Sequence, residues 1–205
     1  MFDEIHVSQR PEYSDGKFVG LVSIDESFQP AKTVLCFMLN SLASKFREIV
    51  ALFPIANINV MTLKNCFFSV VWTVEACGYE VILTCSDNHV VNRNFFTFVL
   101  CGNQLAPYVT HPLDQERKLF IMLDPTHNIK NAYNNFHNKK KFTCPSFSEA
   151  NREIHPNFQH VEDLFLKESS KPLRLAHKLT QASIYPTNIQ KTSAKLSLCF
   201  SRVDL

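Results

Sequence analysis

The sequence has no long apolar run, and this absence sets the first limit on what the protein can be. No stretch approaches eighteen uninterrupted apolar residues, so the sequence predicts no membrane-spanning helix. Acids at Asp3 and Glu4 are not typical of a signal or transit peptide. None of the seven cysteines forms a C-x-x-C pair, which argues against a zinc knuckle and a disulfide framework. We therefore expect reduced thiols and a cytosolic or nuclear protein.

Glycine is scarce, and charge of each sign is concentrated in one part of the chain. All four glycines lie at or before position 102, so we expect a helix-rich second half with few left-handed turns. Residues 1–126 carry 9 Lys and Arg against 13 Asp and Glu, and residues 127–205 carry 12 against 6. This split indicates a cation-binding site beside a polyanion-binding face. Ordinary solvated surface is the simpler alternative.

With 45% apolar residues the chain can form a core, and its first 78 residues predict strands followed by a helix. Short apolar runs predict strands at 1–8, 17–24, 33–42 and 46–54. A helix is predicted over 57–78, because apolar residues recur there at helical spacing. Asn59 can cap its start, and Gly78 can lie just past its end.

The next part of the chain alternates strands with helices. Two continuous apolar runs end at acidic residues and predict buried strands over 80–85 and 118–123. Helices are predicted after them, over 88–100 and 126–137. The order β-β-β-α-β-α-β-α requires three antiparallel strands followed by parallel strand–helix units, and hence a mixed sheet. Beyond residue 143, prolines separate helical stretches over 158–168, 172–183 and 187–201.

Three aspartates follow or begin predicted strands. Asp3 lies on the first, while Asp87 and Asp124 directly follow two parallel-type strands. Functional groups gather at the carboxyl ends of such strands, and several carboxylates there can share Mg²⁺ or Mn²⁺. Two such ions can promote reactions at a phosphodiester. The alternative is that Asp87 and Asp124 only cap the helices that follow them.

The segments FDEIHV, LTCSDN and MLDPTHNIKNAYNNF resemble the catalytic domain of P-element-type DNA transposases, the group that includes THAP-domain-associated transposases. The most specific part is DPTHNIKN, residues 124–131. The resemblance covers most of residues 1–200. It implies an α/β fold with a ribonuclease-H-like, mixed five-stranded sheet and a following helical segment. It also implies a ribonuclease-H-like core over residues 1–143 and the beginning of a helical insertion over 144–205.

The resemblance also implies roles for particular residues. Asp3 and Asp87 resemble the first two catalytic, metal-binding carboxylates, and Asp124 and His127 resemble a supporting element beside them. Contacts with DNA phosphates are implied for the basic and amide residues that follow, with a solvated surface as the alternative for the lysine cluster: Lys130, Asn131, Lys139, Lys140 and Lys141.

The sequence departs from the family pattern in several respects. The family's third carboxylate lies beyond a long insertion, and the glutamates at 149, 153, 162 and 168 lie too early to replace it. No Cys/His module precedes Asp3, and no glycine-rich phosphate loop supports nucleotide binding. Because Met1 falls within the first predicted strand, we expect a partial copy of a longer transposase gene.

The leading hypothesis is a transposase-derived nuclease domain, ancestrally a metal-dependent enzyme for DNA cleavage and strand transfer. Without the third carboxylate we expect it to be inactive or weak. Expected features are Mg²⁺ or Mn²⁺ as cofactor, transposon-end DNA as partner, no membrane association, self-association and a nuclear location. The rival hypothesis is a domesticated or relic domain that binds DNA or protein without catalysis. A doubly wound phosphatase is disfavoured by the leading hairpin strands.

Overall fold

The computed structural model describes residues 1–22, 29–146, 148 and 152–201. It contains two compact units, Met1–Asp124 (unit 1) and Pro125–Leu205 (unit 2), which are described separately. This division lies between the last strand of the predicted core and the helix that follows it. The domain boundary at residue 143 stays a prediction. In the described part of the chain, no helix has both the length and the apolar character needed to cross a bilayer.

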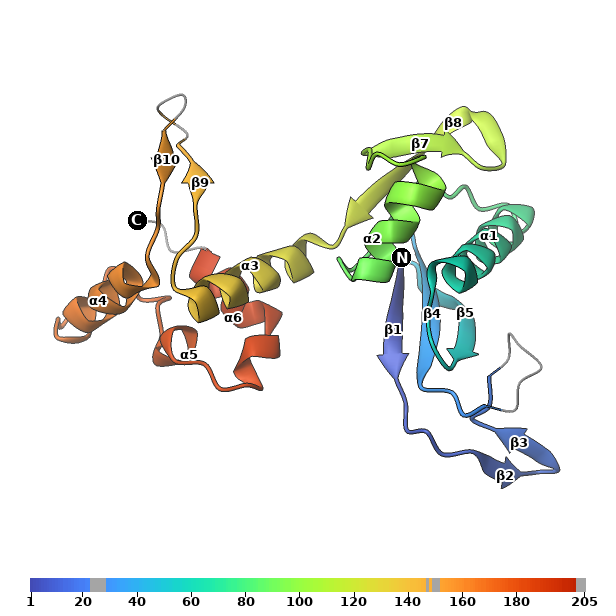
Figure 1. Ribbon diagram of the computed structural model, residues 1–205, viewed down its shortest axis with the longest axis horizontal. Coiled ribbons are helices and arrows are strands. Elements are labelled where there is room, and N and C mark those ends of the chain that lie inside the picture. Colours follow the sequence, from blue (N-terminus) through green and yellow to red (C-terminus); the bar gives the residue numbers. More distant parts are fainter. Residues whose placement is uncertain (23–28, 147, 149–151, 202–205) are drawn as a thin grey trace. The chain divides into compact units, whose positions relative to one another are not determined.

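Unit 1 contains two three-stranded sheets (Figure 1), with the strand orders β1-β4-β5 and β6-β8-β7. The first is antiparallel throughout; in the second, β6 and β8 are parallel. The strands are β1 (Phe2–His6), β4 (Thr33–Asn40), β5 (Arg47–Ile55), β6 (Leu83–Ser86), β7 (Tyr108–His111) and β8 (Asp114–Leu123). The predicted α/β fold with antiparallel and then parallel pairing is therefore confirmed, but the strands form two three-stranded sheets in place of the single five-stranded sheet that was predicted.

The helices of unit 1 also follow the sequence pattern. They are α1 (Val60–Ala76), α2 (Val90–Asn94) and the π-helical turn η1 (Phe95–Leu100). Asn59 caps α1 by accepting a hydrogen bond from the Thr62 N–H at 2.9 Å, and Gly78 lies just past its end at φ +88°. Both cap predictions are confirmed.

Two predicted strands of unit 1 need correction. The run over 17–24 gives only the short strand β3 (Lys17–Val19), which pairs with β2 (Glu12–Ser14) in a separate hairpin. Gly20, at φ +84°, leaves extended geometry and ends that strand; residues 23 and 24 lie outside the described residues. The strand predicted from residue 80 begins at Leu83. β7 was not predicted, and it pairs antiparallel with β8.

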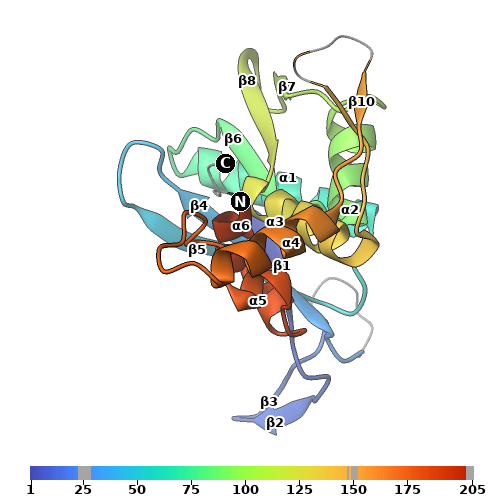
Figure 2. The same ribbon diagram turned by 90° about the vertical axis from the view of Figure 1, so that its left-hand side faces the viewer.

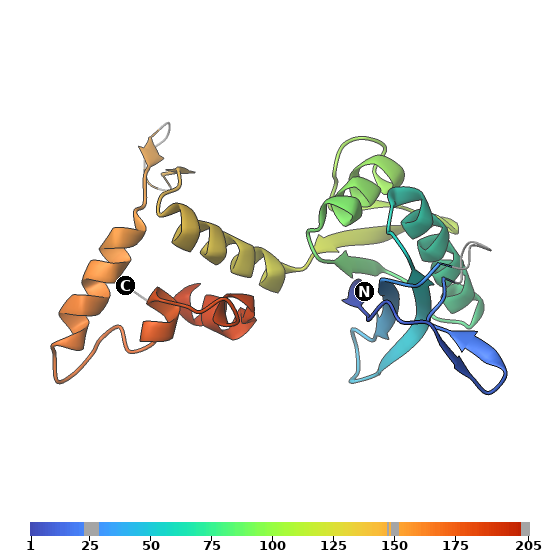
Figure 3. The same cartoon turned by 60° about the horizontal axis from the view of Figure 1, so that its bottom comes forward.

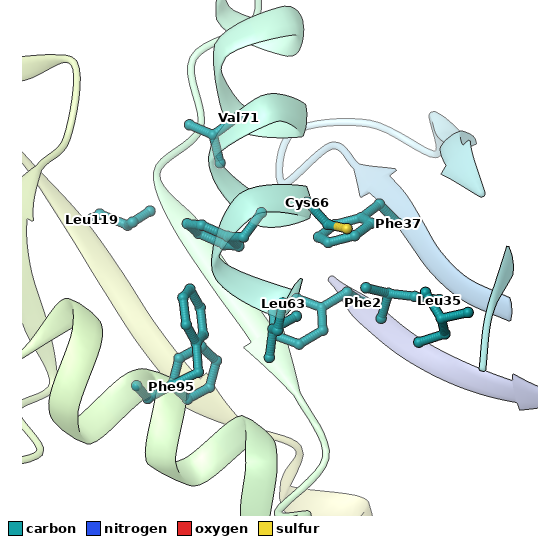
Figure 4. Packing of buried hydrophobic residues seen from close by; sticks show 11 residues of the cluster. Phe2, Leu35, Phe37, Leu63, Cys66, Val71, Phe95 and Leu119 are labelled. Atoms are coloured by element: carbon teal, nitrogen blue, oxygen red, sulfur yellow. The ribbon is translucent and has the colours of Figure 1, made fainter. Parts of the chain in front are cut away.

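The core of unit 1 lies between the strands and the helices α1 and α2 with η1, which cover one face of the strands (Figure 3). Its centre is a cluster of aromatic rings, in which Phe2 packs against Phe37, Phe67, Phe95 and Phe96 at centroid distances of 5.4–6.5 Å (Figure 4). Phe95 and Phe96 are fully buried. Because Phe2 belongs to β1, this cluster fixes the face that β1 presents to the helices.

Unit 2 is mainly helical (Figure 2). Its elements are α3 (Pro125–Lys139), β9 (Cys144–Pro145), β10 (Glu153–Ile154), α4 (Phe158–Ser169), α5 (Gln181–Ile184), η2 (Gln190–Thr192) and α6 (Ala194–Ser201). The helices predicted over 126–137 and 158–168 are confirmed. The helix predicted over 172–183 is wrong except for α5 at its end, and that over 187–201 is divided into η2 and α6.

A buried carboxylate explains the failed helix. The Glu168 carboxylate accepts hydrogen bonds from the N–H groups of Leu175 and Ala176 at 2.6 and 3.3 Å and from Lys171 Nζ at 2.8 Å. These backbone donors are therefore held in a turn and are not available to an α-helix. Leu173 and Leu175 point to solvent, each 78% exposed, so their apolar character did not indicate burial.

Candidate functional site

The ends of β6 and β8 place two predicted site residues side by side. In the parallel pair, Ser86 lies opposite Leu123, and the Asp124 N–H donates to the Ser86 carbonyl at 2.8 Å. Asp87 and Asp124 directly follow these partners. The structure thus brings the second predicted carboxylate and the supporting aspartate to the same edge of the sheet.

Asp87 precedes α2 and is held by two hydrogen bonds. Its Oδ1 accepts hydrogen bonds from the His89 N–H at 2.9 Å and from Asn92 Nδ2 at 2.8 Å. The N-cap residue of α2 is His89, and no side-chain hydrogen bond caps this helix, so the capping role that the sequence left open for Asp87 is not what the structure shows. The two hydrogen bonds instead fix the orientation of the Asp87 carboxylate.

Asp3 lies on β1, opposite Cys36 of β4, and its side chain is exposed. Its Oδ1 accepts a hydrogen bond from the Glu4 N–H at 2.8 Å. Strand β1 contacts β6 as well as β4, which brings the first predicted carboxylate to the strand that leads to Asp87.

Glu4 was not among the predicted site residues, but its carboxyl group interacts electrostatically with both Asp3 and Asp87. Its side chain is 17% exposed, and its Oε1 lies 4.0 Å from His89 Nδ1. Burial raises the pKa of Glu4; His89 lowers it, and the charges of Asp87 and Asp3 raise it. Asp3, Glu4 and Asp87 therefore share one electrostatic neighbourhood. The sequence shows two adjacent acids at positions 3 and 4, but it does not show that the charge of Glu4 interacts with that of Asp87.

The carboxylates of Asp3, Glu4 and Asp87 are the type of ligand that a divalent cation binds, but they are few in number. Mg²⁺ and Mn²⁺ prefer oxygen ligands such as carboxylates. A cation would also relieve the repulsion between Glu4 and the two aspartates, which adds to the effect of burial in raising the pKa of Glu4. Among the residues described, however, no group of three or more His, Cys, Asp or Glu is arranged to hold a metal ion. Asp3 and Asp87 thus fit an incomplete site.

The remaining predicted residues belong to unit 2. His127 and Lys130, both half-buried, and the exposed Asn131 lie on α3. Lys139 ends α3, and Lys139 and Lys141 are exposed.

Lys140 is engaged within unit 2: its Nζ lies 2.9 Å from Glu162 Oε1 and 4.3 Å from the centre of the Phe158 ring. Of the three clustered lysines, this one has a structural role.

Comparisons with known proteins agree with this fold. Residues 1–99 match the family model described as TNP-like, RNase H N-terminal domain. Among solved structures, the chain is similar to one titled Drosophila P element transposase strand transfer complex, with a TM-score of 0.75 and 18% sequence identity. That match covers 97% of this chain and 40% of the other, so this chain spans less than half the length of the transposase in that structure. No curated protein matches.

Proposed function

Because residues 1–99 match the family model described as TNP-like, RNase H N-terminal domain, and the fold is similar to that in a P element transposase complex, we propose that this chain binds a divalent cation and DNA. The cation would be Mg²⁺ or Mn²⁺, held weakly through Asp3 and Asp87. We propose DNA cleavage and strand transfer as the ancestral activity, and at most weak cleavage by this chain. Its DNA partner would place it in the nucleus.

The observation that carries this proposal is the joint ending of β6 and β8, with Asp87 and Asp124 as neighbours and β1 in contact with β6. Asp3 and Asp87 would hold the ion, and His89 and Asn92 would orient Asp87 through its Oδ1. When bound, such an ion polarises a phosphodiester and lowers the pKa of an attacking water. With few protein ligands, we expect weak binding and poor positioning of a second ion.

Titration of Mn²⁺, followed by electron paramagnetic resonance, tests the cation site. Asp3→Asn and Asp87→Asn should each bind Mn²⁺ several-fold more weakly than the wild type, because a neutral amide is a poorer ligand. Asn at position 87 still offers an acceptor to the His89 N–H and to Asn92 Nδ2, so the turn before α2 should keep its geometry. Asp15→Asn is the control, because Asp15 lies in the β2–β3 turn and Asn tolerates its φ of +50°. Equal binding by all four proteins would refute the site.

DNA binding can be tested through Lys139 and Lys141, the two lysines of the cluster that flank the ion-paired Lys140. In Lys139→Gln/Lys141→Gln, the slope of log K against log salt should become shallower by about 2, because each lysine releases roughly one counterion from B-DNA. Lys17→Gln/Lys45→Gln, from unit 1, is matched in charge. Anisotropy of a labelled duplex measures both. If only the control pair changes the slope, the DNA face lies elsewhere.

The rival function is binding of DNA without catalysis. One observation favours it: among the described residues, no group of three or more His, Cys, Asp or Glu is arranged to hold a metal ion. Nicking of supercoiled DNA in Mn²⁺ separates the two. Weak nicking that Asp3→Asn abolishes supports an enzyme, whereas salt-sensitive binding with no nicking supports the rival.

A further inference from the structure

Unit 1 contains a partly buried polar cluster that lies outside the candidate site. Its members are Glu75 near the end of α1, His111 at the end of β7, and Asp114 and Arg117 on β8. The side chain of His111 is 0% exposed and that of Glu75 is 14% exposed. Because a buried charge is costly unless it is paired, the contacts within this cluster decide how it affects the fold.

The Glu75 carboxylate joins the segment that enters β6 to strand β8. It accepts hydrogen bonds from Arg117 Nη2 at Oε2 (2.6 Å) and from Arg117 Nη1 at Oε1 (3.3 Å). Arg117 Nε also donates to Asp114 Oδ2 at 2.7 Å. The Val81 N–H, shortly before β6, donates to Glu75 Oε1 at 2.6 Å. Oε1 therefore serves two donors that come from different parts of the chain.

His111 connects the same carboxylate to the turn between β7 and β8. Its Nδ1 accepts a hydrogen bond from the Leu113 N–H at 3.2 Å, so Nδ1 carries no proton and the neutral ring holds its proton on Nε2. Nε2 lies 3.4 Å from Glu75 Oε1, but it has no hydrogen-bond partner among the described residues. The neutral ring thus fixes the turn and leaves a buried donor unsatisfied beside a carboxylate.

A second proton on His111 changes both of these contacts. Nδ1 becomes a donor, so it can no longer accept the Leu113 N–H. The charged ring also attracts the Glu75 carboxylate, because a hydrogen bond between two charged groups is stronger than one between neutral groups. Nε2 then competes with the Val81 N–H for Oε1.

Three charged groups act on the His111 ring: Glu75 from α1, and Asp114 and Arg117 from β8. The two carboxylates favour the charged ring, and Arg117 disfavours it. Burial has the largest effect and, together with Arg117, lowers the pKa of His111. The ring is therefore neutral at pH 7, and it takes up a second proton only below the ordinary pKa of a histidine, about 6.5.

We propose that His111 is a pH-dependent switch of local structure. In the neutral state, the ring holds the β7–β8 turn through Leu113, and Glu75 holds the entry to β6 through Val81. In the charged state, the turn opens at Leu113, and Glu75 Oε1 exchanges the Val81 N–H for His111 Nε2. Acid thereby loosens the start of β6, the strand that Asp87 follows. This switch does not depend on a bound cation.

Amide hydrogen exchange, followed by NMR from pH 7 to pH 4.5, tests the switch. Protection factors remove the intrinsic effect of pH on exchange. The Leu113 and Val81 amides should each lose about tenfold in protection at the lower pH, because each loses its acceptor. Amides of β4, in the other sheet, should keep their protection. Unchanged protection at Leu113 or Val81, or an equal loss throughout β4, would overturn the proposal.

Two histidine variants form a matched pair. Asn at position 111 can still accept the Leu113 N–H but takes up no proton, so His111→Asn should keep the protection of Leu113 and Val81 at low pH. His155→Asn should behave as the wild type does, because His155 lies after β10 with a side chain that is 64% exposed. An acid-dependent loss in His111→Asn as large as that of the wild type would overturn the proposal.

Nitrogen NMR of the histidine rings in the wild type requires no variant. At pH 7 the His111 ring should carry its proton on Nε2 and none on Nδ1, and both nitrogens should be protonated at the pH at which the Leu113 amide loses protection. A proton on Nδ1 at pH 7, or loss of protection while the ring remains neutral, would overturn the switch.

Discussion

The two units differ in charge and in how they are held together. Unit 1 carries 9 Lys and Arg against 13 Asp and Glu, and unit 2 carries 12 against 6. Unit 1 has an extensive aromatic core spread over both sheets and their helices, whereas the buried cluster of unit 2 centres on Phe158, Leu179 and Ile184. Unit 2 also contains a buried polar contact, in which the Tyr133 hydroxyl donates to the Ser183 carbonyl at 2.8 Å. The candidate carboxylate site thus belongs to the unit with the larger aromatic core, and the excess of basic residues belongs to the other unit.

The largest test of this contrast is removal of one central ring from each unit. Phe95→Ala should destabilise unit 1 by about 3–5 kcal/mol, because Phe95 is fully buried and packs against Phe2, Phe67 and Phe96. Phe158→Ala should cost unit 2 less, because fewer buried residues surround Phe158. Hydrogen exchange of the amides in each unit measures both losses. A larger loss from Phe158→Ala would reverse the comparison.

As the pH is lowered, unit 1 should begin to lose folding stability at a higher pH than unit 2 does. Burial lowers the pKa of His111, and the charge of Arg117 lowers it further. The unfolded chain therefore takes up this proton below about pH 6.5 while the fold resists it, so stability falls as the pH falls. In unit 2, the hydrogen bond from Lys171 lowers the pKa of Glu168. The stability that this hydrogen bond contributes is lost only as the pH falls below the ordinary pKa of a glutamate and through the lowered pKa of Glu168.

Melting curves between pH 7 and 5 test this difference. His111→Asn should show a shallower loss of stability in unit 1 than the wild type, because it has no imidazole to protonate. Its side chain can still accept the hydrogen bond that the Leu113 N–H donates to His111 Nδ1 at 3.2 Å. A wild-type curve that is flat over this range would contradict the role given to His111.

Much of unit 1 could be predicted from the sequence because its signals are local. The caps at Asn59 and Gly78 bound α1 in the sequence as they do in the structure. Strand β7 was missed because no glycine or Asn-Gly pair marks the turn after His111. In unit 2, the helix predicted over 172–183 failed because the carboxylate of Glu168, which lies outside that segment, accepts hydrogen bonds from the Leu175 and Ala176 N–H groups. Hydrogen bonds from the backbone to a side chain leave no periodic signal in the sequence.

The candidate site shows the same limit. Asp87 and Asp124 were predictable because strand ends mark them, and the register of β6 with β8 makes them neighbours. Glu4 was missed because its environment is set by residues far away in the sequence: burial and the charges of His89 and Asp87 act on its carboxyl group.

Helix caps should show where the two units are alike. Asn59 caps α1, and Asn157 caps α4 by accepting a hydrogen bond from the Gln159 N–H at 3.1 Å. Asn59→Ala and Asn157→Ala should each cost about 1 kcal/mol, because a cap depends on local geometry rather than on the size of the core. Chemical denaturation, with the signal of each unit followed separately, measures the two losses. Unequal losses would show that the surrounding core also determines the value of a cap.

The smallest effect should come from the ion pair between Lys140 and Glu162 in unit 2. Its nitrogen–oxygen distance is 2.9 Å, and the Lys140 side chain is 46% exposed, so Glu162→Gln should cost no more than about 1 kcal/mol. The same variant sharpens the DNA prediction, because it frees Lys140 from its partner. If the basic surface of unit 2 binds DNA, Glu162→Gln should steepen the salt dependence of binding, because one more lysine is available to phosphates. Anisotropy at several salt concentrations measures this, with Glu12→Gln in unit 1 as the charge-matched control. An unchanged slope in Glu162→Gln would remove Lys140 from the DNA face and leave it as a structural residue.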